Sequence, residues 1–204
     1  MASVVAKALS RAGNNFEFVV SGQFAPIIEE CPYLKVIIKD TKDVDINFDG
    51  VYEKNPGCIV NYELWFKHAE KILGREIKVQ KPRYKPSLFL DGSVVAECIN
   101  QLRLHNRPWI GINKGSVSDS TRRLSTETIE KIVECYDGRG TIFNMYPYDD
   151  DLGFMLPLKY GKHWWPNLKT LMGYIALMDY VISPETGPFH IANAFDKSTI
   201  SFNQ

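Results

Sequence analysis

The chain has 204 residues, and its 24 Lys and Arg balance 24 Asp and Glu, so the formal net charge is zero. This balance, with no run of Lys or Arg, argues against a general nucleic-acid-binding protein. Hydrophobic residues make up 45% of the chain and charged residues 24%, which is typical of a globular protein with a buried core. No apolar run approaches the 18 residues that a membrane-spanning helix needs.

The four cysteines are scattered along the chain at positions 31, 58, 98 and 135, with no paired spacing. Such spacing does not suit a zinc site or a disulfide framework. It is typical of the reduced thiols of a cytosolic protein, and we expect a cytoplasmic location.

The first half of the chain alternates helices and strands. Apolar residues at helical spacing predict helices over 2–11, 23–30, 62–73 and 94–104, and β-rich runs predict strands over 16–20 and 34–38. The polar, proline-containing segment from His105 to Pro108 has the composition of a boundary. We therefore expect one domain over residues 1–106 and a second over 107–204.

The second half restarts the same alternation. A strand is predicted over 109–112, followed by a loop over 113–123 and a helix whose N-cap is Ser125. Further strands are predicted near 141–145, 180–182 and 199–202, with helices beginning near Leu168 and Pro188. Three successive aspartates, 149–151, are a possible ligand set for a hard cation, but an acidic loop is more often solvated, and we expect no metal.

The stretch from residue 179 to 204 is predicted to form a strand, a tight turn, a helix and a strand. The turn, Ser183 to Gly187, leaves backbone N–H groups at the start of a helix, and Thr186 could add a hydroxyl. An anion such as phosphate is the natural ligand of this arrangement. The pattern alone fits equally well a purely structural turn between two parallel strands.

The segment PETGPFHIANAF also resembles a motif of the heptosyltransferase-like glycosyltransferases of family 9. The matching residues are Thr186, Gly187, Pro188, His190, Ala192 and Ala194, while Glu185 stands where the family usually has Asp. A second family segment resembles Gly115-Ser116 together with the run Arg122 to Glu127. In this chain Arg122 stands where the family has a Lys, and Asn113-Lys114 stands where it has Pro-Gly. Phe24-Ala25-Pro26 and Cys31-Pro32-Tyr33 resemble segments of its first domain.

The resemblance implies an α/β fold of GT-B type, with two Rossmann-like domains that each have a mainly parallel sheet flanked by helices. It implies an enzyme, a glycosyltransferase that moves a sugar, such as a heptose, from a nucleoside-diphosphate sugar to a hydroxyl of a lipopolysaccharide or other surface glycan. The transfer would invert the anomeric centre and need no metal or cofactor. Donor-binding residues would be Gly115, Ser116, Arg122, Glu185, Thr186, Gly187 and His190, although we expect His190 to brace the loop.

In this family the catalytic base is an Asp that follows the first strand. The alignment puts that strand and Asp upstream of Met1, and it puts further C-terminal elements beyond Gln204. From this resemblance we expect a fragment with weak donor binding and absent or very slow transfer, in which the exposed sheet edge pairs in a homodimer or is filled by a rearranged segment. Its partners would be the nucleotide sugar and a glycan or lipid-linked acceptor, with peripheral association at the inner face of the membrane.

Two other functions remain open. The chain could be a non-catalytic nucleotide- or glycan-binding protein, or a nucleotide-sugar epimerase of the same fold. An epimerase would need acids and histidines arranged in a cleft, and the sequence gives no such arrangement.

Overall fold

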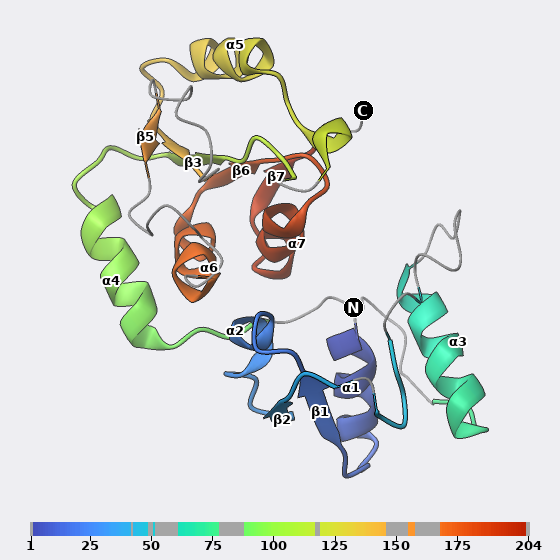
Figure 1. Cartoon of the computed structure of the whole chain (residues 1–204). Helices are drawn as coiled ribbons and strands as arrows, with labels where there is room; N and C mark the ends of the chain where they lie inside the picture. Colours follow the sequence, from blue (N-terminus) through green and yellow to red (C-terminus); the bar gives the residue numbers. More distant parts are fainter. Residues whose placement is uncertain are drawn as a thin grey trace. The chain divides into compact units, whose positions relative to one another are not determined.

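The structure, a computed structural model, describes residues 2–41, 43–48, 51, 61–77, 88–116, 119–145, 155–157 and 168–202. The chain divides into two compact units, an N-terminal unit of residues 1–89 and a C-terminal unit of residues 90–204. Each unit contains its own parallel sheet with helices beside it (Figure 1). The α/β class expected from the sequence is confirmed.

The N-terminal unit is built on two parallel strands whose register runs from Glu17 opposite Lys35 to Val20 opposite Ile38. A core of Val5, Phe66, Ala69 and Ile77 joins its first and third helices. The second helix is shorter than the expected span of 23–30, because turns at Ser21–Phe24 and Ile28–Cys31 enclose it. The elements are α1 (Ala2–Arg11), β1 (Glu17–Val20), α2 (Ala25–Ile28), β2 (Lys35–Ile38) and α3 (Asn61–Leu73).

The C-terminal unit contains a five-stranded parallel sheet with the order β5-β4-β3-β6-β7. All four residues of β3 are buried, as expected for the central strand of a sheet covered on both faces. The elements are α4 (Gly92–Leu102), β3 (Trp109–Ile112), the short 3₁₀ helix η1 (Ser120–Arg122), α5 (Thr126–Tyr136), β4 (Thr141–Asn144), β5 (Leu156–Pro157), α6 (Leu168–Leu177), β6 (Tyr180–Ile182), α7 (Gly187–Ala194) and β7 (Ser198–Ile200).

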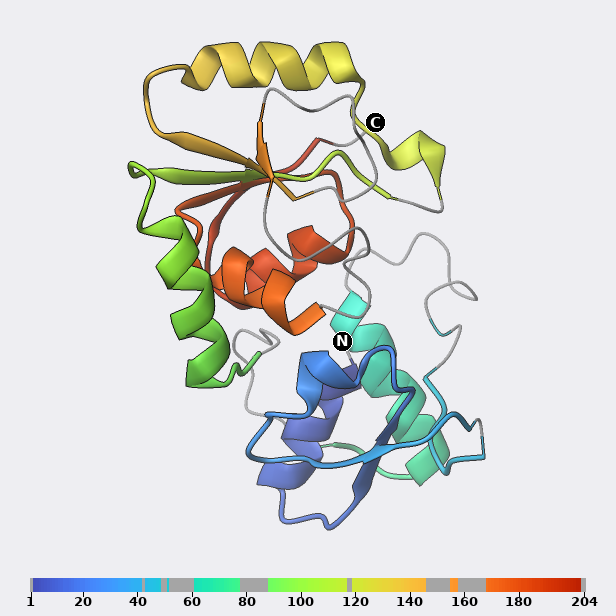
Figure 2. The same ribbon diagram turned by 60° about the vertical axis from the view of Figure 1, so that its left-hand side comes forward.

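Helices cover both faces of this sheet. Helix α5 lies on one face, and α4, α6 and α7 lie on the other (Figures 1 and 2). On the α5 face, Ile129 packs in a core with Ile110 and Ile112 of β3 and Ile182 of β6. The apolar residues of α5 recur at helical spacing, and the cap predicted at Ser125 is confirmed by its hydroxyl, which accepts from Thr128 N at 3.1 Å.

Helix α4 belongs to the C-terminal unit, so the division falls between Phe89 and Leu90 and not at 106/107 as expected. The reason is its packing on α6. The Cys98 thiol donates to the Thr170 carbonyl, and Tyr174 Oη donates to Gln101 Oε1. Gly173 permits this close approach, since a Cβ there would lie 2.8 Å from Cys98 Sγ. Across the described helices, none combines the length and the apolar character that crossing a bilayer requires.

Candidate functional site

The strand order of the C-terminal unit reverses between β3 and β6. From β3 the chain moves outward to β4 and β5, and it then returns to the other side of β3 for β6 and β7. Ile112 and Ile182 are paired at the ends of β3 and β6, so the loops that follow them leave the sheet side by side. Open α/β sheets bind ligands in the crevice outside the carboxyl ends of the strands at such a reversal.

The first of these loops, residues 113–123, is folded back on itself. Gly115 pairs with Arg123 in an antiparallel bridge, and it adopts φ +145°. A Cβ at Gly115 would lie 2.1 Å from the Arg122 carbonyl oxygen, so only glycine fits. Ser116 is used within the loop: its N–H donates to the Arg122 carbonyl at 3.0 Å, its hydroxyl accepts from Asp119 N at 3.1 Å, and its carbonyl accepts from Arg123 Nε.

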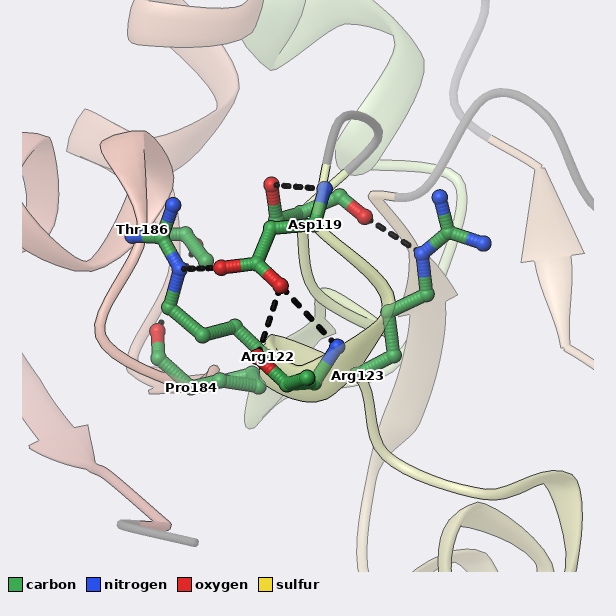
Figure 3. Close-up of polar contacts among 7 residues, drawn as sticks. Asp119, Arg122, Arg123, Pro184 and Thr186 are labelled. Carbon is green, nitrogen blue, oxygen red and sulfur yellow. Dashed lines mark hydrogen bonds and ion pairs between the residues drawn. The ribbon is translucent and has the colours of Figure 1, made fainter.

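Arg122 is held by an ion pair with Asp119 (Figure 3). Its Nε donates to Asp119 Oδ2 at 2.8 Å, and Asp119 Oδ1 accepts from the N–H and the hydroxyl of Thr121. These bonds, from Thr121 first and then from Arg122, lower the pKa of Asp119, which therefore stays ionised. Within the described residues, no hydrogen bond occupies the two Nη groups of Arg122, and its side chain is 54% exposed. The bond from Nε to Asp119 orients the guanidinium, and its two Nη groups remain free to bind a ligand.

The second loop, residues 183–186, is a turn braced from below by Asn113. The Asn113 side chain, 2% exposed, donates one hydrogen bond to Ser183 Oγ and one to Thr186 Oγ1, each at 3.0 Å. Both hydroxyls also lie within hydrogen-bonding distance of the Pro184 carbonyl, at 2.8 and 3.3 Å. This buried polar cluster joins the ends of β3 and β6 and fixes the turn that starts α7.

The cluster leaves the N-terminus of α7 without a side-chain cap. Thr186 occupies the N-cap position with extended backbone, but its hydroxyl makes no capping bond. Pro188 has no N–H to satisfy. Within the part of the chain that the structure describes, the N–H groups of Gly187 and Phe189 have no hydrogen-bond acceptor. Gly187 is exposed, its φ is not positive, and a Cβ there would meet no atom within 4 Å. Two backbone donors at the positive end of a helix are therefore left without a partner among the described residues.

Glu185 and Arg122 both act electrostatically on His190. His190 is exposed as a residue, but partial desolvation of its imidazole by neighbouring protein atoms lowers its pKa from the ordinary value; Glu185 opposes this shift and Arg122 adds to it. The imidazole makes no hydrogen bond with a described residue, and its ring meets Phe189 edge-on at 5.5 Å. The expected bracing by His190 therefore involves no hydrogen bond from its side chain.

The predicted residues thus lie on two neighbouring loops, but they play different parts: some hold the loops together and others present free hydrogen-bond donors. Gly115, Ser116 and Thr186 make bonds or close contacts within the two loops. Arg122 and Gly187 present unoccupied donors, and Glu185 is exposed on the turn between them. Asn113, which sequence reasoning did not include, holds the turn in place.

Within the described ranges, no group of three or more His, Cys, Asp or Glu side chains is arranged so that it could hold a metal ion. The aspartates at 149–151 lie outside these ranges. Cys98 is buried, which raises the pKa of its thiol to about 12 and rules out a thiolate nucleophile at that position.

Comparison with solved structures connects this geometry to known proteins. The chain is similar in structure to a glycosyl transferase of family 9 from Veillonella parvula, with a TM-score of 0.72, 12% identity and coverage of 98% of this chain and 76% of that chain. The chain shares the fold of family 9. ADP-heptose lipopolysaccharide heptosyltransferase II of E. coli gives a TM-score of 0.63 at 13% identity, with 98% of this chain and 79% of that one covered.

A third fold neighbour is the E. coli heptosyltransferase WaaC in a structure with ADP, at a TM-score of 0.58 and 12% identity, covering 98% of this chain and 84% of that one. No protein-family profile matches the sequence. No curated protein matches it by sequence. At this level of identity the likeness establishes the fold, and it agrees with the resemblance that the 185–194 and 115–127 segments carry.

Proposed function

We propose that this chain binds the diphosphate of a nucleoside-diphosphate sugar at the carboxyl ends of β3 and β6 and serves the transfer of that sugar to an acceptor hydroxyl. The observation that carries the proposal is the meeting of unoccupied donors at the reversal of strand order. Arg122 offers its Nη groups from one loop, and α7 offers the N–H groups of Gly187 and Phe189 from the other. The shared fold of ADP-heptose-dependent transferases supports the same assignment.

The chemistry of sugar transfer suits these groups. As the bond between the sugar and the diphosphate breaks, negative charge develops on the leaving oxygen, and fixed donors stabilise that charge without reorganising. A guanidinium already oriented by Asp119 loses little side-chain entropy when it binds a phosphate through two donors. The fold neighbours suggest an extension of this proposal: the sugar is a heptose, and the acceptor is a lipopolysaccharide or another glycan.

Calorimetry with ADP, UDP and GDP, and with their sugar conjugates, tests the binding step. Arg122→Ala should weaken diphosphate binding by about 1.5 to 3 kcal/mol, the usual scale for hydrogen bonds to a charged group. Lys131→Ala is the matched control: it also removes one positive charge and one exposed ion pair, with Glu127 on α5, but it lies away from the two loops. Equal affinities for the two variants would refute the assignment of Arg122.

A second measurement separates the transferase from its alternatives. Transfer of the sugar to an acceptor glycan, shown by product analysis, identifies a transferase, and release of free sugar from the donor separates an enzyme from a binding protein. Conversion of the nucleotide sugar into an isomer identifies an epimerase. Binding without any turnover identifies a nucleotide- or glycan-binding protein.

A further inference from the structure

We infer that Asn113 is a positioning residue that keeps the proposed diphosphate site open by holding the Thr186 hydroxyl away from the N-terminus of its own helix. The inference rests on the proposed function for its ligand, but its structural part can be tested without one. Among the described residues, the side-chain amide of Asn113 hydrogen-bonds to Ser183 and Thr186 and to no residue of α7, so it acts through Thr186.

The first step of the argument is the backbone of Thr186. Its φ of −137° and ψ of −179° are extended, which is the conformation that N-cap residues adopt. Threonine is also one of the preferred N-cap residues, because its hydroxyl accepts a hydrogen bond from the N–H two or three positions along. Position N2 is Pro188, which has no N–H, so the available donor is Phe189 at N3.

The second step is that the Thr186 hydroxyl has another partner, the side-chain amide of Asn113. The Thr186 hydroxyl accepts from the Asn113 amide at 3.0 Å instead of from Phe189, and it lies 3.1 Å from Ser183 Oγ. Asn113 can donate because it is almost fully buried directly beyond β3, where a side-chain amide must find partners. The Asn113 amide, with Ser183 and the Pro184 carbonyl, thus favours the orientation in which the Thr186 hydroxyl faces the inside of the turn and not the Phe189 N–H.

The consequence is a choice between two states of the same turn. With Asn113 bound, Thr186 faces the protein interior and the Phe189 N–H is available to an anion. Without Asn113, the hydroxyl can turn to cap α7, and the capped N–H is no longer available. One neutral hydrogen bond of this kind shifts such an equilibrium by about 3- to 10-fold.

The test compares Asn113→Ala with the double variant Asn113→Ala/Thr186→Val. We expect the Phe189 amide to exchange its hydrogen more slowly in Asn113→Ala than in the wild type, by NMR, and ADP to bind about 3- to 10-fold more weakly. Valine cannot cap, so the double variant should regain fast exchange at Phe189 and bind ADP more tightly than Asn113→Ala. Ser183→Ala, which removes the other acceptor of Asn113 but leaves the bond to Thr186, should affect exchange at Phe189 less than Asn113→Ala.

A merely structural role for Asn113 gives the opposite pattern. Exchange at Phe189 would then be unchanged or faster in Asn113→Ala, and the double variant would bind no better than the single one; either result overturns the inference. If Asn113→Ala does not fold, Asn113→Ser repeats the comparison with a polar group kept in the cavity. A wild type that binds none of the nucleotides would refute the proposed function, while the exchange measurement would still decide the role of Asn113.

Discussion

At the scale of single residues, Gly187 shows how a site can be left open without backbone strain. Its φ is not positive, so its lack of a side chain is not needed for the turn. It is the first residue of α7, it is exposed, and the space beside its Cα is empty. The absence of a side chain matters only if a ligand approaches there.

We therefore predict that Gly187→Val leaves the thermal unfolding transition intact and weakens nucleoside-diphosphate binding by at least about tenfold, because the new methyl groups would fill the space in front of the two free N–H groups. The matched control is Gly92→Val, since Gly92 is the first residue of α4 and also has open space around it. It should keep both stability and affinity. Loss of folding in Gly187→Val alone would show that the glycine is structural.

His190 is the residue whose charge should report on the site. Its pKa is lowered, so the unfolded chain takes up a proton at His190 at a higher pH than the folded chain does. The stability that His190 contributes is present above its unfolded pKa of about 6.5 and is lost as the pH falls below that value.

We predict that His190→Gln loses less stability than the wild type between pH 7 and pH 5, measured by urea unfolding at each pH. An equal loss in both proteins would contradict the lowered pKa. As an independent check by NMR titration, Arg122→Ala should raise the pKa of His190 and Glu185→Gln should lower it further, since Arg122 lowers this pKa and Glu185 raises it.

At the scale of elements, the contact between α4 and α6 determines where the C-terminal unit begins. A Cβ on Gly173 would come within 2.8 Å of Cys98 Sγ and 3.1 Å of Val94 Cγ1. Such distances force the two helices apart or force a side chain to move.

We predict that Gly173→Ala destabilises the protein by about 1 to 3 kcal/mol, the scale of overpacking in a core, as measured by chemical unfolding. Gly92→Ala, at the first position of α4 where an added Cβ would meet no atom within 4 Å, should be neutral or slightly stabilising. If both substitutions had the same small effect, the close packing of α4 on α6 would not be needed for stability.

Elements with a local signature could be predicted from the sequence. The helix that starts after Ser125 has a cap and an apolar stripe, and β3 is a short apolar run. Strand β5 could not be predicted, because Leu156 and Pro157 form a strand only through pairing with Phe143 and Asn144. The start of the C-terminal unit was misplaced for the same reason: the packing of α4 on α6 is a long-range contact.

The candidate site divides in the same way. Gly187 was identified from the turn that precedes a helix, and Arg122 because its segment resembles a known family. Asn113 was missed, since at that position the chain departs from the family pattern. A signal was nevertheless present: Asn113 and Ser183 are polar residues that directly follow the apolar ends of two strands. The sequence does not say that these strands are neighbours, and that adjacency is what brings the two side chains together.

At the scale of the whole molecule, the sheet of the C-terminal unit has two different ends. The loops 113–116 and 183–187 lie at its carboxyl end, where the unoccupied donors are. The amino end carries an ion pair between Arg107 and Asp179, with the Arg107 guanidinium stacked 4.0 Å from the Trp109 ring. A ligand at the reversal of strand order should affect only the first of these ends.

We predict that a saturating nucleoside diphosphate slows hydrogen exchange in peptides covering 113–116 and 183–190 and leaves peptides covering 105–109 and 137–141 unchanged, by mass spectrometry. Bound ligand also stabilises the native state, by about 2.7 kcal/mol at 100 times its dissociation constant. Protection confined to the amino end would place the binding site elsewhere and refute the assignment.

The bond between Asn113 and Ser183 spans 70 residues of chain, and this separation has a consequence during synthesis. At roughly 5 to 20 residues per second, a ribosome needs roughly 4 to 14 seconds to proceed from one partner to the other. During that interval β3 can pair with β4, but its other edge waits for a strand that has not yet been made. A fully apolar strand with one open edge invites pairing with another nascent chain. We therefore expect the nascent chain to be most prone to such pairing in the interval before β6 has been made.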